Sequence, residues 1–399
     1  MLYYLALIIN DLYIILLSEF YLSEMDDGPC PEDSCTMSKI VEETEAFEVN
    51  ATRNPTPHQI ARVNFDSYTC KLGWSSRGDM CAVSTETRIH IYSHNEIELR
   101  HKGSIKHPEC LYDWQWCGYR ESGDVIVTTG RYQPVHLYRV EEQNIHIEGT
   151  YKCINHLDEL SHAYAVTVHE ESDTIICGLK GEVRMFDVRR PGRESLSHVT
   201  RVKREDSGQA GIISCLALSP SIPVFAAGSY DRSVGLYSRE TGESLCVLRG
   251  QQGGLTQVTF SDDGGLLLTG GRKDNEIICW DLRQPGQVLW TVNRVVDTNQ
   301  TISFSLRGQL LVSANTDGSV RAWDVSGHVD PDTCLLEPVA GWTLHCDAVT
   351  GVGWHPSRDV LATSTGQRHF TSEEEEGSGE EDSEENCLTI WDMKNAFKI

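Results

Sequence analysis

The sequence predicts an all-β protein built as a closed β-propeller of seven blades, and three observations support this fold class. Short apolar runs recur along the chain and are separated by Gly, Asp and Ser, which is typical of strands joined by tight turns. Strands that end in an aromatic residue return at a near-constant spacing, which indicates a repeated unit. The chain also has 33 glycines with a hydrophobic fraction of 39%, and no long helical pattern follows its first residues.

The clearest repeat unit lies between Thr256 and Arg283. Two apolar runs flank the turn Ser261-Asp262-Asp263-Gly264, and a third run ends in Trp280-Asp281. A strand that ends in Trp-Asp after such a meander is the signature of a WD-repeat blade. In these blades an Asp of the preceding turn, here Asp274, usually braces the loop backbone.

The same unit can be counted along the chain. Strands end in an aromatic residue at Tyr92, Tyr138, Phe186, Tyr237, Trp280, Trp323 and Trp391. The spacing between consecutive aromatic residues is 43 to 51 residues, except for the last interval, which is 68 residues. This interval falls into the same range once the acidic run 371–386 is treated as an insertion. We predict structural roles for the blade tryptophans and turn aspartates: Asp231, Asp274, Asp317, Trp280, Trp323 and Trp391.

The first 56 residues are predicted to lie outside the propeller. Residues 1–24 are hydrophobic, but Asn10, Asp11 and Glu19 interrupt them, and no Lys or Arg precedes them. A charge in mid-span costs about 3 kcal/mol on insertion scales, so we expect no membrane attachment; the alternatives are an anchor or a true start at Met25. Residues 25–56 are acidic and polar, and we expect a disordered leader.

The predicted propeller occupies residues 57–399. The chain ends seven residues after Asp392, too soon to add the outer strand of the seventh blade. An unpaired edge there would be an aggregation hazard. We therefore predict that a strand near 59–65 pairs with the last strand and closes the ring.

The blades follow in order. Blade one runs from Cys70 to Tyr92, blade two ends at Tyr138, and the loop 153–162 leads into blade three. Blade four spans Gly211 to Tyr237, and blade seven begins at Val349 and carries the acidic insertion in its middle turn. A basic connector at 189–204 is too short and broken to be a firm nuclear-import signal, so we interpret it as a solvated loop.

The charge is strongly acidic, with 34 basic and 59 acidic residues and a net charge of −25. This excludes binding of nucleic acid by global attraction, so any such contact needs a local patch. Residues 373–385 hold nine carboxylates and no base. Mutual repulsion predicts that this run projects into water. It is a solubilising loop, a mimic of nucleic acid, or a loop that steers a basic partner.

Neither a metal, nor a cofactor, nor catalysis is expected. Most of the 14 cysteines sit inside strand patterns, where they behave as small apolar residues in a reducing compartment. The sequence lacks a phosphate-binding Gly-rich loop, a His-Glu-x-x-His motif and a Gly-x-Ser-x-Gly motif. His345, together with Asp347, fits a structural role.

The loops of these blades resemble one family, the telomerase Cajal body proteins, over most of residues 68–392. The specific stretches are Asn155-His156-Leu157-Asp158-Glu159-Leu160, Gly211-Ile212-Ile213-Ser214-Cys215-Leu216-Ala217, Gly228-Ser229-Tyr230, Arg272-Lys273-Asp274, Cys279-Trp280-Asp281-Leu282-Arg283-Gln284, Thr298-Asn299-Gln300 and Ser364-Thr365-Gly366-Gln367-Arg368. The leader departs from the family because it has no long Pro-rich acidic region.

The resemblance implies a nuclear, non-enzymatic protein of Cajal bodies. It implies recognition of the CAB box of H/ACA-type small Cajal body RNAs, and in some lineages of telomerase RNA. The implied partners are these RNAs, the H/ACA ribonucleoprotein proteins, the telomerase ribonucleoprotein, and a chaperonin that assists folding.

We predict an RNA site on the face of the propeller that carries the loops leading into each blade and the turns between its middle strands. The candidates are Asn155, His156, Gln209, Arg232, Gln251, Arg272, Lys273, Asn299, Gln300 and Arg368. Amides and guanidinium groups suit a single-stranded loop, and Tyr230 and Phe370 could stack bases. Alternatively, Arg272 and Arg232 form surface ion pairs with Asp274 and Asp231.

A second function remains open at this stage. The stretches Trp280-Asp281-Leu282-Arg283 and Phe186-Asp187-Val188-Arg189 match the weak Trp-Asp-x-Arg pattern of substrate receptors of cullin ubiquitin ligases. In that case the propeller is a protein-interaction scaffold.

Overall fold

The computed structural model describes residues 55–95, 98–119, 123–141, 144–202, 207–284, 286–368 and 385–397. Within these ranges every regular element is a β-strand, as the sequence predicts. No described segment is a helix with the length and apolarity needed to cross a bilayer. The expectations for residues 1–54 and for most of the acidic insertion lie outside the described residues.

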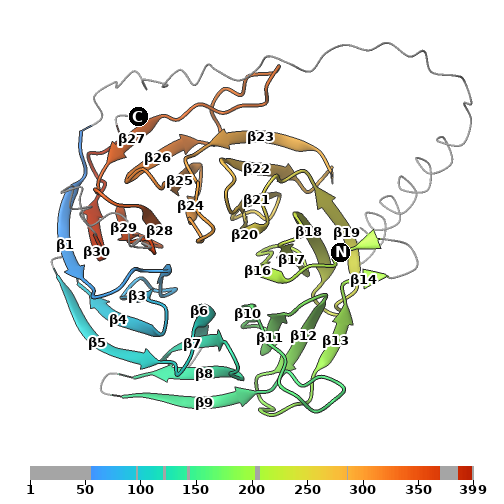
Figure 1. Cartoon of the computed structure of the whole chain (residues 1–399). Helices are drawn as coiled ribbons and strands as arrows, with labels where there is room; N and C mark the ends of the chain where they lie inside the picture. The colour runs from blue at the N-terminus through green and yellow to red at the C-terminus, as the bar shows by residue number, and fades with distance from the viewer. Residues whose placement is uncertain are drawn as a thin grey trace, which may run out of the picture. The chain divides into compact units, whose positions relative to one another are not determined.

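Seven four-stranded antiparallel sheets are arranged in a ring around a central axis (Figure 1). The strands of blades one to three are β2 (Lys71–Trp74), β3 (Met80–Ser84), β4 (Arg88–His94) and β5 (Leu99–Lys106); β6 (Leu111–Tyr119), β7 (Gly123–Gly130), β8 (Val135–Val140) and β9 (Ile145–Tyr151); β10 (Ala165–His169), β11 (Thr174–Gly178), β12 (Glu182–Asp187) and β13 (Leu196–Val199).

Blades four to six follow the same order. They are β16 (Ile213–Leu218), β17 (Val224–Ser229), β18 (Ser233–Ser238) and β19 (Ser244–Arg249); β20 (Leu255–Phe260), β21 (Leu266–Gly271), β22 (Glu276–Asp281) and β23 (Val288–Asn293); β24 (Phe304–Arg307), β25 (Leu310–Ala314), β26 (Ser319–Asp324) and β27 (Ala340–Thr343). A two-stranded ribbon, β14 (Arg201–Val202) and β15 (Ser207–Gly208), lies in the connection between blades three and four.

Blade seven is assembled from both ends of the propeller. It consists of β28 (Val349–Trp354), β29 (Val360–Thr365), β30 (Cys387–Asp392) and, as its outer strand, β1 (His58–Asn64). The register pairs His58 with Asp392 and Asn64 with Cys387, and Figure 1 shows blue β1 beside red β30. The predicted closure of the ring is confirmed.

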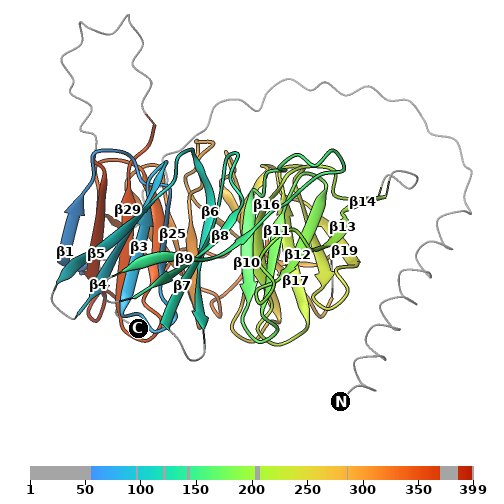
Figure 2. The same cartoon turned by 90° about the horizontal axis from the view of Figure 1, so that it is seen from below.

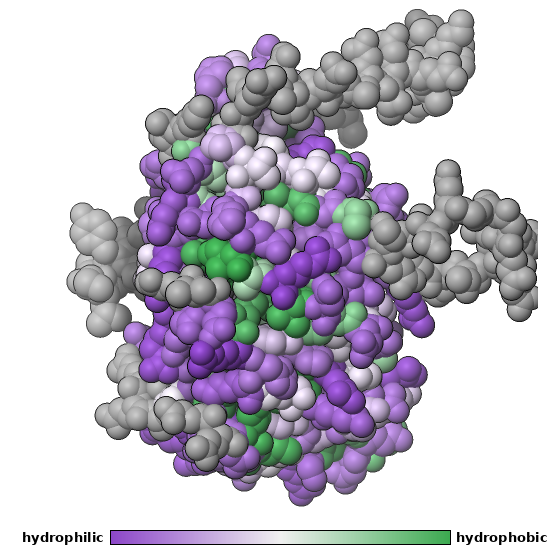
Figure 3. All heavy atoms as spheres, turned by 90° about the vertical axis from the view of Figure 1, so that its left-hand side faces the viewer, coloured by the Kyte–Doolittle hydropathy of each residue, from purple (hydrophilic) through white to green (hydrophobic). Residues whose placement is uncertain are grey.

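The core is a ring of apolar clusters, each between two neighbouring sheets. For example, Leu72 and Val83 of blade one pack with Ala362 and Leu388 of blade seven, and Leu268 of blade five packs with Phe304 and Trp323 of blade six. Each sheet is therefore covered on both faces, which is why its central strands are nearly all apolar. The outer wall near β1 is mostly hydrophilic, with small apolar spots (Figure 3).

The strands run between two faces, and this places the candidate site (Figure 2). The loops that lead into each first strand and the turns between second and third strands emerge on one side, which we call the top face. In blades two, four, five and seven a register shift interrupts the start of the first strand, as between Leu111 and Asp113. Such bulges redirect side chains at the top face.

Candidate nucleic-acid interface

Aspartates of the middle turns hold the loops of the top face. The Asp274 carboxylate accepts from the Gly253 N–H at 2.6 Å and from the Glu276 N–H at 3.1 Å. Asp231 accepts from the Ala210 N–H at 2.8 Å, and Asp317 accepts from the Ser319 N–H at 3.0 Å. Each carboxylate satisfies backbone donors that the turn leaves unpaired, which fixes the loop beside it.

Gln251 is an internal brace of blade five, which corrects its assignment to the RNA site. Its side chain is buried, and its Nε2 donates to Asp274 at 3.0 Å. Thr269 Oγ1 donates to its Oε1 at 2.8 Å, and Trp280 Nε1 donates to Thr269 Oγ1 at 3.0 Å. With its oxygen and nitrogen both engaged inside the blade, Gln251 cannot present its amide to a ligand.

Gln209 is corrected for the same reason. It is fully buried, and its Nε2 donates to the Ala227 carbonyl at 2.9 Å. The Tyr237 hydroxyl donates to its Oε1 at 2.7 Å. From sequence alone, an amide in a loop that leads into a blade is predicted to be an exposed recognition group. Here the amide instead makes its hydrogen bonds inside the blade.

Blade seven has a matching brace with ionisable members. Trp391 Nε1 donates to Thr363 Oγ1 at 2.8 Å, Thr363 pairs with His345 Nε2 at 2.8 Å, and His345 Nδ1 lies 2.8 Å from Glu385 Oε1. His345 therefore links Thr363 to Glu385 inside the blade. Glu385 also accepts from Arg62 on β1 at 3.0 Å.

The position of Glu385 corrects the description of the acidic run as entirely solvated. Its side chain is only 6% exposed. Burial opposes its ionisation, but hydrogen bonds from His345 and Cys346 lower its pKa to about 2. Burial lowers the pKa of His345, so this ring stays neutral and donates from Nδ1. His345, Glu385 and Cys387 lie close enough to hold a metal, but the hydrogen bonds of the brace account for this grouping.

The remaining tryptophan of the predicted structural set is also internal. Trp323 is fully buried between blades five and six. Arg294 is 2% exposed, and its guanidinium lies 5.9 Å from the centroid of the ring of Phe304, which belongs to the same cluster. Its Nη1 donates to the Ile302 carbonyl at 2.8 Å, and burial lowers its pKa to about 10. This hidden cation ties down the two ends of the loop that carries Asn299 and Gln300, and no sequence pattern marked it.

Arg272 and Tyr230 form a cation–π stack on the top face. The Arg272 guanidinium lies 4.0 Å from the centroid of the Tyr230 ring, and Tyr230 remains 37% exposed. The two residues come from the middle turns of blades five and four. Neither Arg272–Asp274 nor Arg232–Asp231 forms an ion pair, although the structure describes all four residues, so the ion-pair alternative is wrong for them.

Two further cations stand beside this element on turn tips. Lys273 and Arg232 are exposed and adopt positive φ values of 47° and 68°. Residues other than glycine rarely adopt this left-handed backbone conformation, and it places both residues at the apex of their turns. Two exposed cations therefore emerge from neighbouring turns of one face.

The remaining candidates divide into exposed groups and loop braces. His156, Asn299 and Arg368 are exposed. Asn155 instead holds its own loop, because its Oδ1 accepts from the Leu157 and Glu159 N–H groups. Gln300 is half-buried, and its Oε1 accepts from the Arg368 N–H at 3.3 Å. Phe370 lies outside the described residues.

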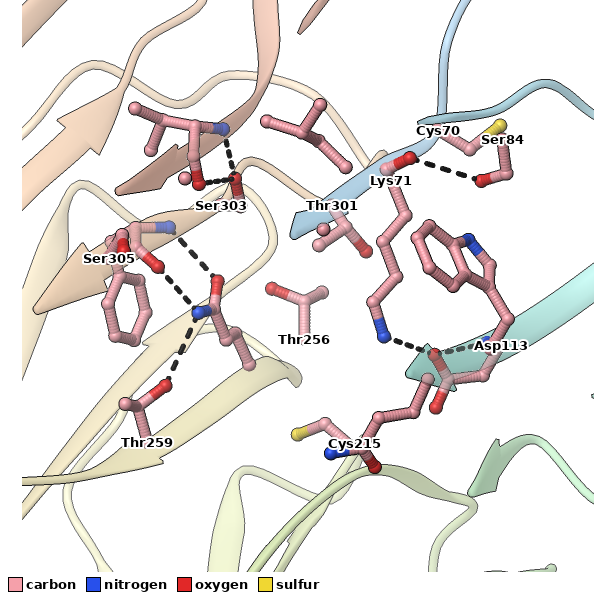
Figure 4. A pocket seen from close by; sticks show the side chains of 18 of the residues that line it. Cys70, Lys71, Ser84, Asp113, Cys215, Thr256, Thr259, Thr301, Ser303 and Ser305 are labelled. Carbon is pink, nitrogen blue, oxygen red and sulfur yellow. Dashed lines mark hydrogen bonds and ion pairs between the residues drawn. The ribbon is translucent and has the colours of Figure 1, made fainter. Parts of the chain in front are cut away.

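The central channel opens between these groups and was not singled out from sequence. It encloses about 730 Å³ and is lined at the top by Tyr68, Tyr112, Asn299 and Gln300. Inside it, Lys71 Nζ donates to Asp113 Oδ1 at 2.6 Å, as Figure 4 shows. Asp113 also accepts from the Val166 N–H at 3.0 Å, so this ion pair joins blades one, two and three.

Comparison with known proteins agrees with the geometry. A family model for the WD domain, G-beta repeat, matches residues 201–238, 242–281 and 297–324. Telomerase Cajal body protein 1 of Mesocricetus auratus is 40% identical over 294 residues, covering 72% of this chain and 53% of that protein. The chain is a WD-repeat homologue of the telomerase Cajal body proteins.

Other relatives carry the same name. Telomerase Cajal body protein 1 of Homo sapiens is 39% identical over 331 residues, which is 78% of this chain and 59% of that protein. The telomerase Cajal body protein 1 homolog of Drosophila melanogaster is 29% identical over 280 residues, covering 67% of this chain and 48% of that protein. The chain thus spans about half the length of the curated relatives it matches.

Proposed function

We propose that the propeller is a non-enzymatic RNA-binding protein that recognises the CAB-box loop of H/ACA-type small Cajal body RNAs, telomerase RNA included where it carries this loop. It would thereby act in the Cajal bodies of the nucleus, in complexes with the H/ACA ribonucleoprotein proteins. The names of the relatives support an association with telomerase and Cajal bodies.

The observation that carries the proposal is the Arg272–Tyr230 stack. A guanidinium over an aromatic ring offers a planar surface for a base and a positive charge for a phosphate. Lys273 and Arg232 add charge on either side, so a protein with a net charge of −25 has a local cationic patch on its top face. Single-stranded loops expose the unstacked bases and phosphates that such a patch binds.

The test is a double substitution with a charge-matched control. Arg272→Ala with Lys273→Ala is expected to weaken binding of a CAB-box hairpin roughly tenfold or more. It should also make the salt dependence shallower by about 1.4 in slope, because about 0.7 counterions are released per contacted phosphate of a single strand. The melting temperature should move by no more than a few degrees.

The control pair is Arg189→Ala with Arg190→Ala. These arginines have 76% and 74% exposed side chains and follow β12, away from the top face. The change in net charge is the same, so a loss caused by charge alone would appear in both variants. Wild-type affinity in the folded Arg272 and Lys273 variant would place the site elsewhere.

No observation favours the cullin-receptor alternative. Arg283, which would make the adaptor contact, binds its own neighbour, with Nε and Nη2 each 2.9 Å from the Asp281 carboxylate. Arg189 pairs with Asp173. Isolation of cross-linked material decides between the functions: small RNAs support our proposal, whereas a cullin adaptor without RNA would replace it.

A further inference from the structure

A second cluster of aromatic side chains lies on the top face, away from the Arg272–Tyr230 stack. It consists of Tyr112 at the start of β6, Tyr132 in the turn between β7 and β8, and His162 and Tyr164 in the loop that leads into β10. β6 and β10 are neighbouring first strands beside the channel (Figure 1). We call these four residues the tyrosine cluster.

The rings of the tyrosine cluster are in direct contact. The centroids of Tyr112 and Tyr164 are 5.0 Å apart with an interplanar angle of 36°. Tyr132 meets His162 edge-to-face at 4.8 Å. Offset and edge contacts at these distances hold aromatic rings in fixed positions, so the cluster is preorganised without a ligand.

The cluster keeps a large apolar surface in water. Tyr132 is 59% exposed and Tyr112 is 37% exposed. Tyr132 also has a φ of 54°, a strained conformation for a bulky residue that a turn tolerates where a function requires it. Exposure of the ring and the left-handed backbone of Tyr132 are both unfavourable, and the fold nevertheless keeps this ring at the surface.

We propose that the tyrosine cluster is a second base-stacking subsite, which receives an unpaired base of the same RNA loop; this rests on the proposed function. Every base has a face that stacks on an aromatic ring. Tyr112 also lines the channel mouth together with Asn299 and Gln300, so hydrogen-bonding amides and stacking rings share one opening.

The charge at the cluster favours RNA over a cationic ligand. Aromatic groups of this kind can also bind a methylated lysine. Here, however, the Arg131 guanidinium already lies 5.1 Å from the centroid of the Tyr132 ring. A second cation would be repelled by this guanidinium, whereas a phosphate next to a stacked base would be attracted by it.

The experiment measures binding of a CAB-box hairpin to the full chain over a range of salt concentrations. Tyr132→Ala is expected to weaken binding about tenfold, the loss typical of one base–aromatic contact, while Tyr132→Phe keeps near-wild-type affinity. The salt slope should stay at the wild-type value, because no phosphate contact is removed. Leu196→Ala, at a position 60% exposed on outer strand β13, is the matched control.

A second measurement does not depend on a folded alanine variant. Photo-cross-linking with 4-thiouridine in the loop of the hairpin should label a peptide that contains Tyr132 or Tyr112 of the wild-type chain. Cross-links confined to other peptides would overturn the subsite. So would Tyr132→Ala affinity within twofold of wild type.

The outcomes separate this subsite from the proposed function. If Arg272→Ala with Lys273→Ala weakens binding and Tyr132→Ala does not, RNA binding stands and the subsite falls. If the wild-type chain does not bind the hairpin, both fall. A trimethyl-lysine peptide that binds the wild-type chain, loses affinity in Tyr132→Ala and is not displaced by the hairpin would assign the cluster to a protein partner.

Discussion

Blades five and seven contain the same chain of hydrogen bonds made from different side chains. In blade five it runs from Trp280 through Thr269 and Gln251 to Asp274. In blade seven it runs from Trp391 through Thr363 and His345 to Glu385. An amide offers an acceptor oxygen and a donor nitrogen, as a neutral imidazole offers two different nitrogens. The hydrogen-bond chain needs one acceptor for the threonine hydroxyl and one donor to the carboxylate, and either side chain supplies both.

The difference lies in what each chain is attached to. Blade five is one continuous segment, 255–293. Blade seven joins β1 to β28–β30, and its Glu385 accepts from Arg62 of β1 at 3.0 Å. The ionisable version of the brace therefore lies where the ring closes. We expect blade seven to be more sensitive than blade five to substitution and to acid.

Deletion of residues 57–67 should have the largest effect. It removes β1 and leaves the outer edge of β30 unpaired along its whole length, with buried backbone groups that lose their partners. We expect no cooperative thermal transition, measured by circular dichroism. Deletion of residues 1–45 is the control and should leave the melting temperature unchanged. A normal melt after the first deletion would show that blade seven does not need its closing strand.

Substitution of Glu385 or Asp274 should show which hydrogen-bond chain contributes more to the free energy of unfolding. Glu385→Ala removes the acceptor of His345 Nδ1, of the Cys346 N–H and of Arg62 Nη1. Each donor left unsatisfied costs about 1 to 3 kcal/mol, so we expect a loss of about 3 to 5 kcal/mol in all. Asp274→Ala removes the acceptor of the Gly253 N–H and of the Glu276 N–H and one of the two acceptors of Gln251 Nε2, at about 2 to 3 kcal/mol. Denaturant unfolding measures both. A larger loss for Asp274→Ala would reverse the ranking.

The pH dependence of stability should belong to blade seven. The folded-state pKa of His345 is below its usual 6.5, and that of Glu385 falls from 4.5 to about 2. A depressed pKa gives stability that is present above the unfolded-state value and is lost as the pH falls. Stability should therefore decline below pH 6.5 through His345, and further from pH 4.5 towards pH 2 through Glu385.

A reciprocal exchange isolates this effect. His345→Gln copies the blade-five arrangement and should cost about 1 to 2 kcal/mol at pH 7, while the melting temperature falls less between pH 7 and pH 4.5. Gln251→His should make the fall steeper. If the pH profile of His345→Gln matches that of the wild type, other groups set the acid sensitivity.

The sequence predicted the repeated features and missed the paired ones. Blade number, the closing strand and the bracing of loops by Asp274 follow from local patterns that each blade repeats. The internal roles of Gln209, Gln251 and Glu385 depend on contacts between residues 18 to 40 positions apart, which no local pattern shows. Tyr112 and Tyr132 were missed because their shared surface forms only when blades two and three meet, with a bulge and a left-handed turn.

Removal of the acidic insertion should have the smallest effect, provided that the deletion stops before Glu385. A cut of residues 373–384 takes out eight carboxylates and leaves the His345–Glu385 contact in place. Shortening a loop changes its closure entropy only slightly, so the free energy of unfolding should change by less than about 1 kcal/mol. Extending the cut to Glu385 should cost about 3 kcal/mol more, because His345 Nδ1 and the Cys346 N–H lose their acceptor. RNA affinity should stay level or rise in the shorter deletion, since the removed carboxylates would repel RNA. A large loss of affinity after that deletion would mean that the insertion itself contacts the RNA.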